Sequence, residues 1–207
     1  MTIRFVYFDL GNVLATFDVD RACNNVAQRF GVDPEAVRHG IWSSGVQDRF
    51  EHGHEDEESF AAVVRECLSL THESAATEEL LSLLSDIFEP VDGMADIVDA
   101  VRQSGTRLGI LSNTCAAHWR WIVAQDYAAL HGRFDAVILS YEVGSMKPDV
   151  AIYHAAQVAS GVAPDEILFF DDRVDNVDAA LQRGWNASRF TDAKTAGEVL
   201  RYHGVLR

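Results

Sequence analysis

The chain is poor in cysteine and contains no long apolar run. Its three cysteines, Cys23, Cys67 and Cys115, lie far apart and form no C-x-x-C pair. This disfavours a disulfide framework or a zinc site and favours reduced thiols in a cytoplasm. No apolar stretch approaches the roughly 18–20 residues that a membrane span needs, and the N-terminal residues lack the layout of a secretion signal. We therefore expect a cytoplasmic protein that does not cross a membrane.

Basic residues are also scarce, with 17 Lys and Arg against 32 Asp and Glu, for a net charge of −15. Such a chain repels nucleic acid and anionic membranes at long range, so neither is an expected partner. It would also repel a phosphorylated substrate, and any anion site must be made locally by a metal, a lysine or a helix N-terminus. Whether the protein is a monomer or a homodimer is left open by the sequence.

Short apolar segments alternate with helix-length amphipathic segments over most of the chain. Apolar segments typical of buried strands span residues 3–9, 107–112, 134–140, 166–171 and, more weakly, 187–190. The intervening helical patterns cover residues 94–103, 116–130, 150–160 and 174–183. This alternation predicts an α/β fold, a doubly wound and mostly parallel sheet of the Rossmann-like kind with helices on both faces.

The region from about residue 17 to residue 89 breaks this alternation. It contains no convincing strand, but helical patterns cover residues 19–30, 34–43, 57–70 and 77–87. We therefore predict a core of residues 1–15 and 91–207, interrupted by a helical cap at residues 16–90. The densest charge run, Glu51 to Glu58, is expected to be a solvated turn, and a metal role for its two histidines is disfavoured.

Four of the predicted strands end in polar residues. Asp9 ends the first, Ser112 to Thr114 follow the second, a loop ending at Lys147 follows the third, and Asp171 and Asp172 end the fourth. In a parallel sheet these ends share one edge, where ligands bind. Each group alone suits a turn or a helix cap, but together they predict a nucleophile, a hydroxyl, a cation and paired carboxylates in one site. Lys147 also precedes a predicted helix start, where a cation is favourable only if it faces an anion.

These positions carry a recognisable pattern. Residues 8–14 (FDLGNVL), 111–114 (LSNT), 147–149 (KPD) and 170–176 (FDDRVDN) resemble the four motifs of the haloacid dehalogenase (HAD) superfamily. The predicted insertion resembles the helical cap found in one subfamily. The forms of the first and fourth motifs are most similar to those of small sugar-phosphate phosphatases and of the phosphatase domain of soluble epoxide hydrolase.

The resemblance implies a magnesium-dependent hydrolase with Asp9 as the nucleophile, which would form an aspartyl-phosphate. It implies that Mg²⁺ is held by Asp9, the backbone carbonyl of Gly11 and Asp172. Hard carboxylate and carbonyl oxygens are the ligands that this ion prefers. Asp171 and Asn176 would orient the water around the metal.

The same resemblance assigns the phosphate contacts. Ser112 and the backbone amide of Asn113 would hold the phosphoryl oxygens, and Lys147 would offset charge on the aspartyl-phosphate and its transition state. The implied substrate is a small phosphorylated metabolite, with sugar phosphates among the candidates. His118 and the cap residues Trp42, Arg49 and Phe50 are further candidates to touch the substrate, whereas Trp119 and Trp121 are expected to pack on the core.

Gly11 departs from the family pattern. Many family phosphatases carry an aspartate at this position as general acid and base, and glycine cannot transfer a proton. Either a cap residue such as Asp18, Asp20 or His52, or a metal-bound water, replaces it, or the leaving group needs little protonation. Two alternatives to the phosphatase also remain: a 2-haloacid dehalogenase that uses Asp9 without a metal, and a non-catalytic binding module with this fold.

Overall fold

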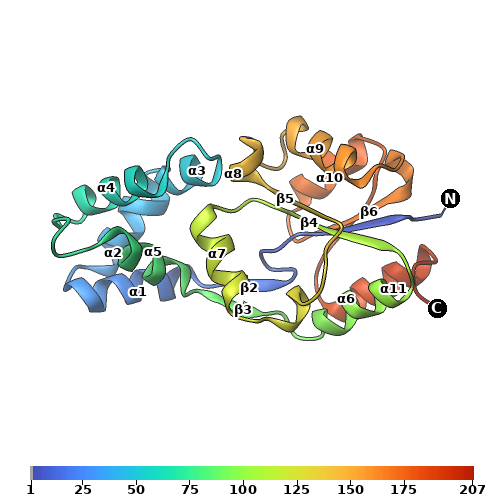
Figure 1. The fold of residues 1–207 in the computed structure, drawn as a ribbon, viewed down its shortest axis with the longest axis horizontal. Coiled ribbons are helices and arrows are strands. Elements are labelled where there is room, and N and C mark those ends of the chain that lie inside the picture. Colours follow the sequence, from blue (N-terminus) through green and yellow to red (C-terminus); the bar gives the residue numbers. More distant parts are fainter. Residues whose placement is uncertain (1) are drawn as a thin grey trace.

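The computed structural model describes residues 2–207 and contains a five-stranded parallel sheet in the order β5-β4-β1-β6-β7 (Figure 1). The five strands run over β1 (Phe5–Phe8), β4 (Arg107–Ser112), β5 (Ala136–Leu139), β6 (Ile167–Asp171) and β7 (Asn186–Arg189). All four pairings in this sheet are parallel. The predicted doubly wound fold and its five strands are confirmed.

The central strand β1 is buried on both faces because helices cover each side of the sheet. Phe5 and Tyr7 pack into one hydrophobic cluster, while Val6 and Phe8 pack into the other, as the alternation of side chains along a strand requires. One layer contains α9 (Val150–Ser160) and α10 (Val174–Gln182), and the other contains α6 (Met94–Gln103) and α11 (Ala193–Tyr202) (Figure 1). The helix α11 follows the last strand and was not predicted.

The remaining core elements connect the strands. They are α7 (Ala116–Ala124), the 3-10 turns η2 (Ala128–Leu130) and η3 (Pro164–Glu166), and α8 (Ser140–Val143). The predicted helix over residues 116–130 was too long, because α7 ends at Ala124 and Asp126 adopts a left-handed conformation with φ of 58°. Trp119 and Trp121 pack against the core cluster, as predicted.

Helices fill the segment between the first and second motifs. They are α1 (Val19–Phe30), α2 (Pro34–Arg38), the π-helical turn η1 (His39–Ser43), α3 (Val46–Glu51), α4 (Glu57–Cys67) and α5 (Thr77–Ser85). The short helix α3 was not predicted. Figure 1 shows these helices as a separate lobe beyond the carboxyl end of the sheet, on the far side from both chain termini.

A two-stranded antiparallel ribbon joins this lobe to the core. Its strands are β2 (Ala15–Phe17) and β3 (Phe88–Pro90), with Phe17 opposite Phe88. The expectation that the insertion contains no strand was wrong here, because three-residue strands are too short to show a periodic pattern. The predicted cap boundaries fall within this ribbon. None of the described helices is long and apolar enough to cross a membrane.

Candidate active site

The site lies where β1, β4 and β6 end. Asp9 directly follows β1, Ser112 ends β4 and Asp171 ends β6, and the three strands are hydrogen-bonded neighbours. Asp9 donates its backbone N–H to the carbonyl of Phe170 at 2.9 Å, so the backbone next to the carboxylate is still part of the sheet. The carboxyl ends of parallel strands thus bring together the groups that the sequence placed at separate strand ends.

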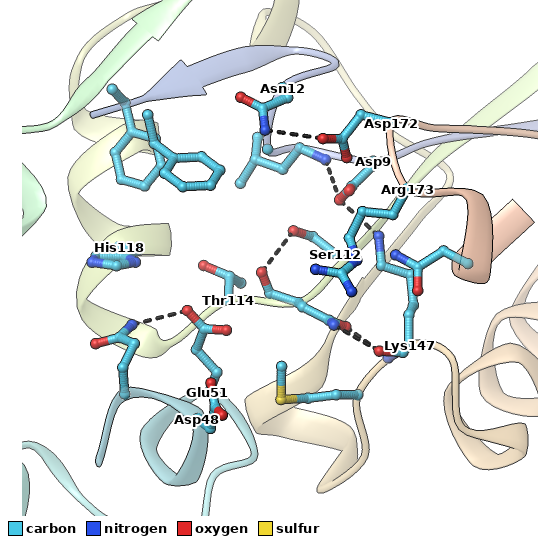
Figure 2. A pocket seen from close by; sticks show the side chains of 18 of the residues that line it. Asp9, Asn12, Asp48, Glu51, Ser112, Thr114, His118, Lys147, Asp172 and Arg173 are labelled. Atoms are coloured by element: carbon cyan, nitrogen blue, oxygen red, sulfur yellow. Dashed lines mark hydrogen bonds and ion pairs between the residues drawn. The ribbon is translucent and has the colours of Figure 1, made fainter. Parts of the chain in front are cut away.

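Lys147 is the buried cation of the site (Figure 2). Its Nζ lies 2.8 Å from Oδ1 of Asp9 and 2.7 Å from Oδ2 of Asp171, and it donates to the carbonyl of Leu111 at 2.9 Å. These three acceptors match the three N–H donors of an ammonium group. Burial alone would lower the pKa of Lys147, but Asp9 and Asp171 outweigh it and raise the pKa, so the side chain stays charged.

The helix predicted over residues 150–160 is confirmed, and Lys147 lies just before it. The helix α9 begins at Val150, with Asp149 as its N-cap, while the Lys147 side chain points back to the strand ends. Its position depends instead on Asn113. The Asn113 amide accepts from the backbone N–H of Lys147 at 2.7 Å and donates to its carbonyl at 2.9 Å.

Asp171 is completely buried, and its carboxylate accepts hydrogen bonds that fix the positions of several neighbouring groups. Besides Lys147, it accepts hydrogen bonds from the side-chain amide of Asn176, at 3.0 and 3.1 Å, and from the backbone N–H of Arg173 at 2.9 Å. The other polar atom of that amide, Oδ1 of Asn176, is buried without a partner. A buried acceptor left in this way indicates that a donor such as water belongs beside it.

Asp172 stands beside Asp9 and is only half-buried. Its Oδ2 accepts a hydrogen bond of 3.0 Å from Nδ2 of Asn12, a residue with a left-handed backbone φ of 56°. Asparagine tolerates this conformation better than most residues. Asn12 belongs to the first motif, but its contact with Asp172 was not predicted.

Carboxylate oxygens of Asp9, Asp171 and Asp172 lie within 4.8 Å of one another, which is the spacing of a possible metal site. Burial raises the pKa of Asp9 to about 7, with Asp171 adding to the rise and Lys147 opposing it. With all three carboxylates ionised and one ammonium group beside them, the net charge is −2 in a poorly solvated place. A divalent cation would neutralise this charge and favour the ionised form of Asp9.

A cavity of about 310 Å³ opens above these groups and reaches the cap lobe. Its core side includes Asp9, Gly11, Ser112, Asn113 and Lys147, so every predicted nucleophile and phosphate-binding residue faces the same space. The volume is at the small end of ligand pockets, which suits a small molecule.

The cap contributes a different set of residues from those suggested by sequence. Trp42 lines the cavity as expected, but Phe50 is buried against Phe60 with ring centroids 4.3 Å apart, and Arg49 pairs with Glu55. The structure adds Gln47, Asp48 and Glu51, all on α3. Glu51 was assigned to a solvated turn because it begins the charge run. The spacing of Val46 and Phe50, one helical turn apart, was the signal for a helix here.

The three side chains suggested as replacement acids are absent from the lining of this cavity. Asp18 caps the N-terminus of α1, and Asp20 pairs with Arg38. His52 lies by an outer depression beside Pro148 and Asp149. The hypothesis that one of these cap residues reaches the leaving group gains no support from this arrangement.

His118 lines the cavity near the ribbon, as predicted, with its ring edge-on to Phe88. Burial lowers its pKa to about 4, and a hydrogen bond to the backbone of Leu84 opposes this shift only in part. The imidazole is therefore neutral near pH 7, and it does not replace the general acid that is missing at Gly11.

The sequence as a whole matches a family model described as a haloacid dehalogenase-like hydrolase over residues 3–184. The chain belongs to this family. The family resemblance and the hydrolase class predicted from the four motifs are thereby confirmed. The matched range includes all four motifs and the residues at the strand ends.

Several relatives of this HAD-like hydrolase are similar over most of their length. A Mycobacterium tuberculosis protein named as a phosphatase is 33% identical over 194 residues, covering 90% of this chain and 87% of that protein. A D-ribitol-5-phosphate phosphatase of Bacteroides thetaiotaomicron is 24% identical and covers 88% and 89%. A HAD family enzyme of the same organism, solved with magnesium and inorganic phosphate, has a TM-score of 0.76 at 22% identity, over 92% and 95% of the two chains.

Proposed function

We propose that this HAD-like hydrolase is a magnesium-dependent phosphatase of small phosphorylated metabolites, with sugar phosphates among the candidate substrates. The observation that carries the proposal is the buried contact of Lys147 with Asp9 and Asp171 beneath a small cavity. The names of two relatives support phosphatase activity, and one of them acts on a sugar-alcohol phosphate.

The residues present fit a magnesium ion. Asp9 and Asp172 offer carboxylate oxygens close together, and Oδ1 of Asn176 is a buried acceptor without a protein donor. Asp9, the carbonyl of Gly11 and Asp172 would hold the ion, while Asp171 and Asn176 would orient its surroundings. When bound, magnesium supplies positive charge that lets two anions approach each other. A neighbour of the same fold is solved with this ion and phosphate.

In the first chemical step, an oxygen of Asp9 attacks phosphorus and the bond to the leaving oxygen breaks. The backbone N–H of Leu10, at 2.7 Å, and Nζ of Lys147 both contact Oδ1 of Asp9. These two contacts fix the orientation of the carboxylate during the attack. Negative charge moves from Asp9 to the phosphoryl group as the new bond forms. Lys147 remains beside that charge throughout, which stabilises the transition state electrostatically.

In the second step, water attacks phosphorus, and the aspartyl-phosphate is released as inorganic phosphate with Asp9 restored. We assign Ser112 and the amide of Asn113 to the phosphoryl oxygens in both steps. Ser112 is almost fully buried and lines the cavity next to Asp9. The link between Asn113 and the backbone of Lys147 keeps the phosphate-binding loop and the cation in one unit.

The two alternatives have weaker support. A 2-haloacid carries a carboxylate, yet the cap side of this cavity presents the acidic Asp48 and Glu51. A binding module has no need for a lysine buried between two carboxylates, an arrangement that is costly unless it is used.

The test is phosphate release from a panel of phosphorylated metabolites, with magnesium and after exhaustive chelation. Turnover should require magnesium, and Asp9→Asn should abolish it while thermal stability stays unchanged or rises, because one charge leaves an acidic cleft. Full turnover after chelation, together with halide release from 2-haloacids, would favour the dehalogenase. Retention of most activity in Asp9→Asn would refute the covalent mechanism.

A further inference from the structure

The cap helix α3 presents two faces with different chemistry. Val46 and Phe50 are buried in the hydrophobic cluster of the cap, while Gln47 and Glu51 line the catalytic cavity. Nε2 of Gln47 donates to Oε1 of Glu51 at 2.9 Å, a contact between residues one helical turn apart. Figure 2 shows Glu51 entering the pocket on the side away from Asp9, with Thr114 between them.

The backbone of Glu51 is anchored to the phosphate-binding loop. The hydroxyl of Ser140 donates to the carbonyl of Glu51 at 2.6 Å and accepts from the backbone N–H of Thr114 at 2.9 Å. Gly53 packs so closely against Tyr141 that a β-carbon would lie 2.3 Å from its carbonyl oxygen. The position of Glu51 relative to the reacting phosphoryl group is therefore set by the core.

Burial raises the pKa of Glu51, and the hydrogen bond from Gln47 opposes this rise. When Glu51 is ionised, no cation in the described part of the cavity is free to balance it. Lys147 is held by Asp9 and Asp171, and Nη2 of Arg173 lies 2.8 Å from Oδ2 of Asp175 at the exposed rim. Asp48 adds a second negative charge on the cap side. A leaving group with its own negative charge would meet like charge there, and like charges at a poorly solvated contact repel each other strongly.

We infer that Glu51 is a specificity-determining residue that accepts hydrogen bonds from the hydroxyl groups of an uncharged leaving group and rejects leaving groups that carry a carboxylate. This inference rests on the proposed phosphatase function. Gln47 and Thr114 beside Glu51 are uncharged hydrogen-bonding groups that can pair with further hydroxyl groups of the leaving group. Trp42 and Phe88 supply the apolar surface for its carbon skeleton.

The test compares glycerol 3-phosphate with 3-phosphoglycerate, which share a three-carbon skeleton and a primary alkyl leaving oxygen but differ in one carboxylate. The kcat/KM of the wild type should favour glycerol 3-phosphate by about 100-fold or more. An equal rate for the carboxylated ester would overturn the inference.

The variant Glu51→Gln keeps the shape and the acceptor for Gln47 but removes the charge. It should lower kcat/KM for glycerol 3-phosphate by about 10- to 100-fold, the loss of one hydrogen bond to a charged group. It should also reduce the preference over 3-phosphoglycerate to below about tenfold. Glu66→Gln is the matched control, since Glu66 is exposed on the same cap, and it should change neither value.

Hydrolysis of p-nitrophenyl phosphate separates this inference from the proposed function. This ester has no hydroxyl group for Glu51, so the ratio of kcat/KM for glycerol 3-phosphate to kcat/KM for p-nitrophenyl phosphate should fall in Glu51→Gln and stay unchanged in Glu66→Gln. The circular dichroism spectrum and the melting temperature of each variant show that it is folded. If the wild type hydrolyses no phosphate ester, the proposed function fails. If it hydrolyses them and Glu51→Gln leaves the preference unchanged, only the role of Glu51 fails.

Discussion

The glycine at position 11 has a measurable consequence for the rate of the first chemical step. A general acid contributes about 10²- to 10⁴-fold, which corresponds to about 3–5 kcal/mol of barrier. Gly11 carries no side chain, and a β-carbon there would lie 3.3 Å from Cε1 of Phe17. The ring of Phe17 therefore lies against the position from which an acid side chain would extend.

We expect the rate constant for aspartyl-phosphate formation to fall steeply as the leaving group becomes more basic. An aryl phosphate or a sugar 1-phosphate should react at least about 100-fold faster than a simple primary alkyl phosphate, since only the latter needs the proton. Single-turnover rates over a series of phosphate esters measure this dependence. Equal rate constants across the series for the wild type would refute this argument. That result would indicate that another group, such as a cap residue, protonates the leaving oxygen.

The variant Gly11→Asp should flatten the same dependence by accelerating the alkyl esters. The contact of 3.3 Å requires the Phe17 ring to move by a few tenths of an ångström, and Phe17 is 45% exposed, so space is available. If the single variant is inactive, the double variant Gly11→Asp/Phe17→Ala removes the ring that the new side chain would contact. The single variant Phe17→Ala is its matched control. Acceleration of aryl and alkyl esters by the same factor would contradict a role in proton transfer.

Three further predictions concern the metal, its neighbours and the pH dependence of stability. Calcium should support turnover poorly after chelation, in contrast to magnesium, because its looser coordination misplaces the phosphoryl group, and equal rates with both ions would contradict this. Asn12→Ala should weaken magnesium binding about 10- to 100-fold by releasing Asp172, measured by titration of activity against magnesium, while Asn24→Ala on the distant face of α1 serves as control. Because the pKa of His118 is about 4 when folded but 6.5 ordinarily, the unfolded chain takes up a proton first as the pH falls, and the free energy of unfolding should drop by about 2 kcal/mol between pH 7 and 5 from this residue. Urea titrations at both pH values should show a smaller drop for His118→Gln, and an identical drop would contradict the assignment.

The residues at the strand ends were accessible from sequence because two simple regularities determine them. Apolar segments such as 107–112 and 166–171 identify buried strands, and parallel strands share one carboxyl edge. The polar residues after each strand therefore had to meet, as Asp9, Asp171 and Lys147 do. Their catalytic roles came from the family resemblance and stay predictions.

The cap wall was not accessible in the same way. The helix α3 has only six residues, and a π-helical turn precedes it, so no long periodic pattern marks it. Glu51 belongs to a dense charge run that is typical of solvent-exposed turns, and only its contact with Ser140 in the core brings it to the cavity. Likewise, the hydrogen bond from Asn12 to Asp172 depends on the left-handed backbone conformation of Asn12. A short sequence motif does not reveal this conformation.

The short ribbon between core and cap also affects the entropy that the chain loses when the central sheet forms. Phe5 on β1 pairs with Arg107 on β4 across roughly 100 residues, and β1 pairs with β6 across a still longer separation. Once Phe17 pairs with Phe88, about 70 of those residues are removed from the loop that β1 and β4 must close. By the logarithmic dependence of closure entropy on length, this shortcut lowers the cost of joining the two strands by about 1 kcal/mol. The helical lobe then folds as a side branch, and the central sheet assembles as if its first two strands were near neighbours in the chain.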